Sequence, residues 1–194
     1  MMLYSATADV AEYVSRCRDI NRFAGCCRQC AAYGRFWACP PYEADVEGMI
    51  DGFTHVTLVA VRIEDYARGA AVSESQAILL PYRRRLQRLL LDTEAAIDSP
   101  ALALSFAGQC IYCPDGECTR PQGMPCRHPD LVRPSLESLG FDVTESARHY
   151  LGLEIIWGSK GVLPPYLVLA SALFHCSPDG AASFFLNNWP ASSR

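Results

Sequence analysis

The hydrophobic and polar residues of the chain follow patterns that predict alternating strands and helices. Residues 55–63 are apolar almost throughout and rich in β-branched side chains, which is typical of a strand covered on both faces. Apolar residues recur at intervals of three and four over residues 9–18 and again from about 72 to 97, and both segments are predicted helices. Residues 101–108 and 166–176 are further apolar runs that predict buried strands.

Shorter elements are predicted between and after these segments. Residues 43–52 follow two prolines and end at a glycine, which indicates a short helix. Residues 134–139 begin with proline and precede a glycine, so they predict another short helix. Thr144 is a suitable N-terminal cap for a helix over residues 144–152, and residues 154–157 are a candidate edge strand.

The succession of strand, long helix and strand over residues 55–108 predicts a β-α-β unit. The crossover of such a unit is right-handed and its two strands are parallel. A length of 194 residues favours one domain over residues 1–194. We therefore expect an α/β fold with a small, mostly parallel sheet flanked by helices. Ligands gather beyond the C-terminal ends of strands in such sheets, and a cysteine-rich loop follows the predicted strand 101–108.

Charge and hydropathy narrow the classes of partner. Lys and Arg total 17 against 21 Asp and Glu, giving a net charge of -4 that provides no general attraction for nucleic acid. The apolar run over residues 162–176 contains two prolines and is shorter than the roughly 20 residues of a membrane-spanning helix. No export signal is visible at the N-terminus. We expect a soluble cytoplasmic protein that uses its ten cysteines for metal or redox chemistry rather than for disulfides.

Four cysteines occur within one short loop, GQCIYCPDGECTRPQGMPCRHP. They are Cys110, Cys113, Cys118 and Cys126. A Cys-x2-Cys pair allows two sulfurs from one turn to bind the same ion or cluster, and later cysteines complete the ligand set. Four thiolates serve both zinc and iron-sulfur clusters, so the spacing predicts a metal without selecting between them.

A second group of cysteines lies earlier in the chain, in GCCRQCAAYGRFWACPPY. It contains Cys26, Cys27, Cys30 and Cys39. Cys27 and Cys30 form another Cys-x2-Cys pair, and Cys39 ends an aromatic loop before two prolines. This group could hold a second metal or contribute thiols to a shared site. The alternative for Cys26 is a buried apolar cysteine, and the isolated Cys17 and Cys176 are interpreted as core residues.

Charged and polar residues near the cysteines have two interpretations each. Arg120 and Arg127 could offset the negative charge of a thiolate-ligated cluster, or they are ordinary surface arginines. His128 could be a fifth donor, although a structural or surface role is the simpler interpretation. Asp115 and Glu117 lie inside the loop and are interpreted as turn formers, with an acid–base role as the alternative.

Four arginines recur on the predicted long helix. They are Arg83, Arg84, Arg85 and Arg88. A docking surface for an acidic partner is one interpretation of this run. A solvated outer face is the simpler one, because charge runs on helices commonly have no other role.

Three blocks of sequence resemble the predicted metal-binding proteins of domain of unknown function 2284. The blocks are CRQCAAYGRFWACPPY, the cysteine loop that ends in CRHP, and RPSLESLGFDV at residues 133–143. The resemblance covers most of the chain and implies a metal, most simply an iron-sulfur cluster, on the later four cysteines. It also implies that Cys27, Cys30 and Cys39 match the earlier family motif. It implies no reaction, and the doubled Cys26-Cys27 departs from the family pattern.

Three functions are compatible with this sequence. The first is a cytoplasmic redox protein that holds a 4Fe-4S cluster and transfers electrons to a partner protein. The second is a zinc-stabilised binding or interaction module without redox activity, in which the aromatic segment 33–37 contacts the partner. The third is an enzyme in which the metal binds substrate and an acid in the loop assists. No nucleotide-binding fingerprint accompanies the cysteines.

Overall fold

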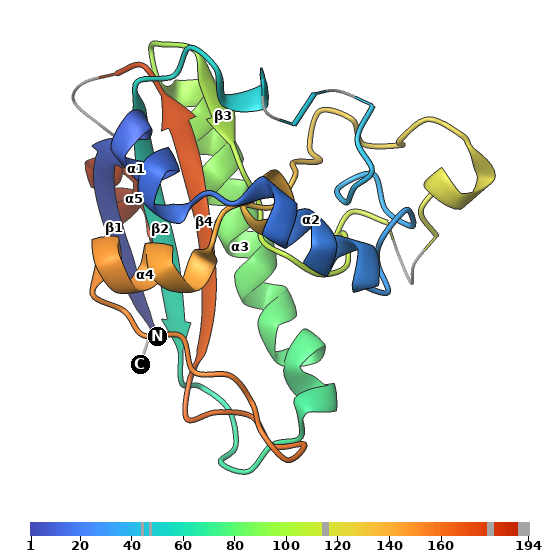
Figure 1. The fold of residues 1–194 in the computed structure, drawn as a ribbon. Coiled ribbons are helices and arrows are strands. Elements are labelled where there is room, and N and C mark those ends of the chain that lie inside the picture. Colours follow the sequence, from blue (N-terminus) through green and yellow to red (C-terminus); the bar gives the residue numbers. More distant parts are fainter. Residues whose placement is uncertain (44, 47, 114–116, 178–180, 190–194) are drawn as a thin grey trace.

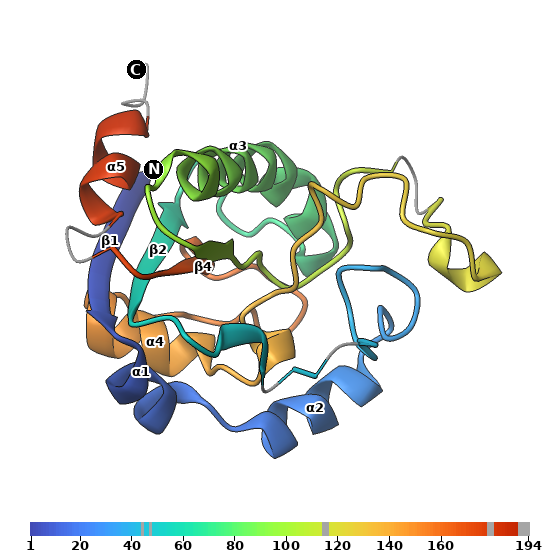
Figure 2. The ribbon, with the colours of Figure 1, turned by 90° about the horizontal axis from the view of Figure 1, so that it is seen from above.

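The computed structural model consists of a four-stranded sheet with helices on both faces (Figures 1 and 2). It describes residues 1–43, 45–46, 48–113, 117–177 and 181–189. The strands are β1 (Met2–Asp9), β2 (His55–Ile63), β3 (Ala101–Ala103) and β4 (Leu167–His175). The helices are α1 (Val10–Cys17), α2 (Ile20–Gln29), α3 (Ser75–Ala96), α4 (Val143–Leu151) and α5 (Ala182–Asn188). None of the helices described is long and apolar enough to cross a bilayer.

The sheet has the order β1-β2-β4-β3, and every neighbouring pair is antiparallel. The prediction of a mostly parallel sheet is therefore wrong. β2 and β3 do run in the same direction on either side of the long helix, because both are antiparallel to β4. They are not hydrogen-bonded to each other, since β4 lies between them and pairs through His175 with His55 and Ala101. The result is a split β-α-β unit.

Both faces of the sheet are covered, as the apolar pattern of β2 predicts. Val56 and Leu58 pack into a core with α1 and α4, whereas Val59 and Val61 pack into a core with α3 and α5. Successive side chains of a strand point to opposite faces, so a strand that is buried on both sides has no polar alternation. Figure 2 shows these two layers of helices on opposite sides of the strands.

The predictions of the first helix and of the long helix are confirmed, whereas the helix predicted over residues 43–52 is largely wrong. α1 begins where predicted, and the side chain of Asp9 caps it by accepting from the Glu12 N–H at 3.0 Å. The long helix is α3, which continues through Pro81. Only a 3-10 turn at Gly48–Ile50 forms in the segment 43–52, where residues 44 and 47 lie outside the described part of the chain.

The remaining short elements differ in extent or kind. Residues 134–139 form only a 3-10 turn at Glu137–Leu139. The predicted helix 144–152 is confirmed as α4, but it is capped by Asp142 rather than by Thr144, because the Asp142 carboxylate accepts from two backbone N–H groups. The predicted strand 101–108 ends at Ala103, and residues 154–157 form no strand. The elements β1, α2 and α5 were not predicted.

A close contact at Gly140 fixes the helix that carries the first cysteines. The Asp19 N–H, just before α2, donates to the Gly140 carbonyl at 2.7 Å. Gly140 has a φ of +92°, and a Cβ at this position would lie 2.9 Å from the Cα of Ile20. Glycine is therefore required both by the left-handed backbone and by the packing of α2.

Gly140→Ala is expected to destabilise the protein by roughly 2 to 4 kcal/mol, combining left-handed strain and steric overlap. Gly152→Ala is the matched control, because Gly152 has a φ of +60° and no atom within 4 Å of a Cβ. The control is expected to cost only about 1 kcal/mol of left-handed strain. Urea unfolding of both variants measures the difference, and equal losses would contradict the packing role assigned to Gly140.

Candidate metal centre

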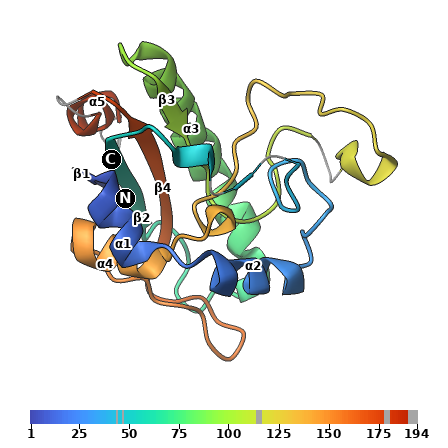
Figure 3. The ribbon, with the colours of Figure 1, turned by 45° about the horizontal axis from the view of Figure 1, so that its top comes forward.

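The two cysteine groups lie in neighbouring loops to one side of the sheet. In Figures 1 and 3 the loop after α2 and the long loop after β3 lie next to each other, away from β1 and β2. Cys26 and Cys27 occupy the last turn of α2, and Cys30 is its C-terminal cap. Cys39 follows in the loop, directly before the cis peptide between Pro40 and Pro41.

The later cysteines follow the C-terminal end of β3, after residues 104–109. Cys118 is buried, while Cys110, Cys113 and Cys126 are half-buried. Residues 114–116 of this loop, including Asp115, lie outside the described part. Glu117 is exposed, with its carboxylate 3.8 Å from the Arg127 guanidinium. Glu117 therefore already has a charged neighbour on the surface.

The later four thiols are electrostatic neighbours. Burial raises the pKa of Cys110, and a backbone N–H from Tyr112 opposes the rise. The three other thiols of the loop raise the pKa further; they are Cys113, Cys118 and Cys126. Cys110 therefore lies within electrostatic range of the three other thiols of its loop.

The earlier thiols form a second group of electrostatic neighbours, which lies near the first group. Burial raises the pKa of Cys39 to about 11, and Cys30, Cys27 and Cys110 raise it as well. Burial also raises the pKa of Cys27, with Cys30 as the next cause. Cys39 and Cys110 lie within electrostatic range of each other, so the two groups are near each other although more than seventy positions separate these residues in the sequence.

Backbone amides donate to the sulfurs in both groups. The Ala32 N–H donates to Cys30 Sγ at 3.5 Å, and the His128 N–H donates to Cys126 Sγ at 3.4 Å. The N–H of Tyr112 stands in the same relation to Cys110, two residues further along the chain. Hydrogen bonds to sulfur stabilise thiolates and tune the metals that they bind. His128 thus interacts with Cys126 through its main-chain N–H group.

Arg120 joins the two cysteine loops. Its guanidinium donates to the Phe36 carbonyl at 2.6 Å, and it also donates to the carbonyls of Cys39 and Pro41. The guanidinium lies 5.2 Å from the ring centroid of Trp37. Arg120 is therefore no ordinary surface arginine, because it holds the loop around Cys39 against the loop that carries the later cysteines.

Trp37 and Tyr42 add further connections. Trp37 Nε1–H lies 3.3 Å from Thr119 Oγ1 and 3.2 Å from the Met124 carbonyl, so the indole belongs to the junction of the loops. The Tyr42 hydroxyl lies 2.8 Å from both the Ala38 carbonyl and Ser138 Oγ. These contacts position the first cysteine loop from both sides.

The thiols are gathered without forming a closed cage. All ten cysteines are free. Within the described residues, no three Cys, His, Asp or Glu side chains converge as metal ligands. The residues still fit a thiophilic metal, because each cysteine group contains several sulfurs and backbone N–H groups that donate to those sulfurs. Closing a cage requires the thiols to turn toward a common centre.

A comparison with protein families decides the affiliation of the chain. The sequence model of the family described as "Predicted metal-binding protein (DUF2284)" matches residues 16–169, a segment that contains both cysteine groups. The chain belongs to the DUF2284 family. The resemblance seen in the sequence is thus confirmed, and the family supports metal binding. The searches of curated proteins and of solved structures found no significant match to this DUF2284 chain.

Arg83 is a residue of the DUF2284 site that sequence analysis misplaced. It is 8% exposed, its Nη2 donates to the Gln109 carbonyl at 2.9 Å, and it lies 5.0 Å from the centroid of the Phe106 ring. Burial lowers the pKa of Arg83, while the charges of Cys110 and Cys39 oppose that shift. The solvated-face interpretation is wrong for this arginine, although Arg84 and Arg88 are exposed.

One sequence signal could have placed Arg83 correctly. It lies three and seven positions before Leu86 and Leu90, which are buried on α3. Residues at this spacing share a helix face, so an arginine there is directed inward. The same buried face of α3 leads from the sheet core to the cysteine loop of this DUF2284 protein.

Proposed function

We propose that this protein holds a 4Fe-4S cluster on the later four cysteines and exchanges electrons with a redox partner protein in the cytoplasm. The proposed ligands are Cys110, Cys113, Cys118 and Cys126. The observation that carries the proposal is that one loop supplies four thiols, and three of them lie within electrostatic range of the fourth, Cys110. When bound, such a cluster supplies one-electron redox chemistry.

Two arginines support a negatively charged centre at this place. Arg83 is buried within electrostatic reach of Cys110 and Cys39, and Arg120 lowers the pKa of Cys39. A cluster with four thiolate ligands carries net negative charge, which these guanidinium groups offset. Arg127 contributes less, because it is exposed and pairs with Glu117.

The earlier cysteines are proposed as additional ligands beside the cluster. Cys27, Cys30 and Cys39 act on one another electrostatically, and the proximity of Cys39 to Cys110 supports a second metal adjacent to the first. Cys26 is exposed on α2 rather than buried, and it is left out of the proposed set.

A zinc-stabilised interaction module is the second candidate function. The contacts of Arg120 and Trp37 connect both loops into one unit, and a structural zinc ion would stabilise that unit further. Tyr33 remains 36% exposed in this unit and is available to a partner. Zinc binds four thiolates without colour and without redox activity.

Metal analysis of protein purified without oxygen distinguishes the two functions. We expect about four irons and four acid-labile sulfides per cluster, with a broad visible absorption that dithionite bleaches. If the earlier cysteines also bind metal, the metal content per protein molecule is correspondingly higher. Stoichiometric zinc in a colourless protein would reject electron transfer and establish the interaction module instead.

A further inference from the structure

An apolar pocket of about 400 Å³ is lined in part by Phe106 and Ala107, which precede the cysteine loop in the sequence. β3 pairs with β4 only opposite Leu173–His175, so the first half of β4 has no strand beside it on that edge within the described chain. The pocket occupies this uncovered edge, and Leu167–Ala170 form one of its walls. Its volume is within the range of small-molecule sites.

The irregular segment 153–165 forms the opposite wall and is held in place by backbone hydrogen bonds. The Val72 N–H donates to the Gly161 carbonyl at 2.9 Å, and the Leu163 N–H donates to the Ala70 carbonyl at 2.9 Å. A Cβ on Gly158 would lie 2.8 Å from the Val162 carbonyl oxygen, so this wall is closely packed. The pocket is therefore preformed rather than a gap between loose loops.

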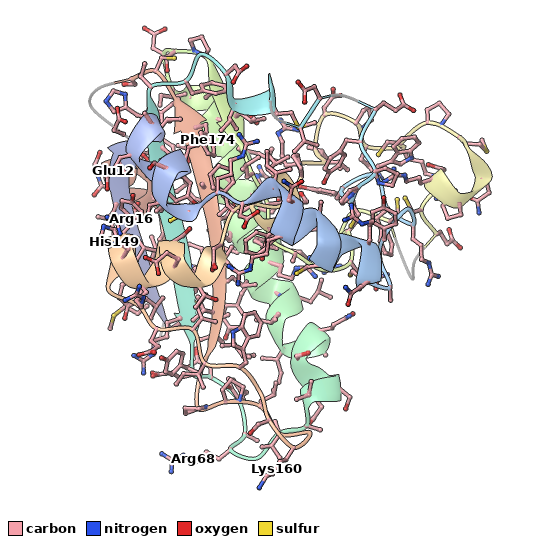
Figure 4. All side chains as sticks on the ribbon, viewed as in Figure 1. Glu12, Arg16, Arg68, His149, Lys160 and Phe174 are labelled. Carbon is pink, nitrogen blue, oxygen red and sulfur yellow. The ribbon has the colours of Figure 1, made fainter. Side chains whose placement is uncertain are left out.

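The mouth of the pocket carries exposed apolar side chains. Trp157 is 70% exposed, and Val72 and Ile156 are each 41% exposed. Contiguous exposed apolar surface beside a cavity is typical of a ligand-binding site. Arg68 and Lys160 extend into solvent at the loop tips in Figure 4, and neither belongs to the lining.

Glu137 is the single charged residue among the described residues that line this pocket. Its Oε2 is buried and has no hydrogen-bond partner among the described residues. Burial raises the pKa of the carboxyl group, and the positive charge of Arg83 opposes the rise. Ser135 and the backbone of Ala107 hydrogen-bond the carboxyl group. A buried acceptor without a partner is costly, and a donor supplied by a ligand removes that cost.

We propose that this pocket binds a small molecule with an apolar body and one hydrogen-bond-donating head group, a hydroxyl or an ammonium. The head group donates a hydrogen bond to the Glu137 carboxyl group. Van der Waals contact with the walls provides the affinity, and Glu137 selects for the donor. A ligand whose head only accepts hydrogen bonds is disfavoured, because it leaves the Glu137 Oε2 acceptor without a donor. Glu137 lies within electrostatic range of Cys27 and Arg83, but no cysteine lines the pocket, and the proposal does not depend on the proposed function.

Four probes that share a phenyl-alkyl body test this selectivity. They are 2-phenylethanol, 2-phenylethylamine, 3-phenylpropanoate and ethylbenzene. Fluorine NMR of protein labelled with 5-fluorotryptophan reports binding through the Trp157 signal, which a Trp157→Phe sample assigns. We expect saturable shifts with at least one donor-headed probe at about tenfold lower concentration than with ethylbenzene or the carboxylate. The two donor arms separate a hydroxyl ligand from an ammonium ligand.

Two variants locate the selectivity. Glu137→Gln is expected to weaken the donor-headed probe by about tenfold while ethylbenzene binding persists, which shows an intact pocket. Glu154→Gln is the control, since Glu154 is exposed in the same segment and does not line the pocket. The proposal is overturned by equal binding of all four probes, by preference for the carboxylate, or by the absence of saturable binding.

If the Glu137→Gln variant does not fold, the relative affinities of the four probes for the protein of natural sequence decide whether the proposal holds. Metal content is recorded in the same samples, so failure here and failure of the cluster assignment are distinguishable.

Discussion

Cys110→Ser is expected to abolish metal binding by the later cysteine group and to weaken it at the earlier one. Cys110 is the thiol on which Cys113, Cys118 and Cys126 all act, and it is also a neighbour of Cys39. Loss of groups that only support a ligand commonly costs 10- to 100-fold in metal affinity, so loss of this ligand is expected to exceed about 100-fold. Metal content after anaerobic purification, followed by competition with a chelator, measures the effect.

Cys176→Ser is the matched control for this experiment. Cys176 is half-buried, lies outside both cysteine groups, and its thiol contacts the Gly52 carbonyl at 3.4 Å. This variant is expected to retain the full metal content of the natural sequence. Equal metal loss in both variants would indicate a general folding defect, and full retention in Cys110→Ser would remove Cys110 from the ligand set.

Arg120→Ala is expected to separate the two cysteine loops and to lower both stability and metal retention. The substitution removes donors from the carbonyls of Phe36, Cys39 and Pro41, together with the contact to Trp37. Hydrogen bonds from a charged donor contribute about 1.5 to 3 kcal/mol each, although their losses are not additive. We expect a combined loss of roughly 3 kcal/mol, measured by urea unfolding, and faster metal release to a chelator.

Two further arginine variants test the geometry of Arg120. Arg120→Lys is expected to recover only part of the stability, because an ammonium cannot present the fork of donors that reaches three carbonyls. Arg127→Ala is expected to change stability by less than about 1 kcal/mol, since its ion pair with Glu117 is exposed. If Arg120→Ala behaves like Arg127→Ala, the clamp assigned to Arg120 does not exist.

Local sequence patterns predicted the strands and helices whose burial follows one regular pattern along their whole length. β2 is apolar on both faces, and α1 repeats at helical spacing, so each shows its burial directly in the sequence. β1 escaped prediction because it mixes polar and apolar residues at the edge of the sheet, where burial is only partial. β3 ended early because the Leu104 N–H makes one more hydrogen bond to β4, and Ser105 then pairs with residues 134–136 in an isolated bridge instead of continuing along β4.

The sequence by itself determined the two cysteine groups, the family, and the common direction of β2 and β3, because ligand spacing and helical crossovers are local properties of a chain. Only the tertiary structure decided that β4 lies between those strands and makes the sheet antiparallel. It also decided that Arg83 is buried, that Arg120 joins the two loops, and that Glu137 lines an apolar pocket. These properties depend on contacts between segments that are far apart in the sequence. A local sequence pattern does not determine which distant segment packs against a given residue.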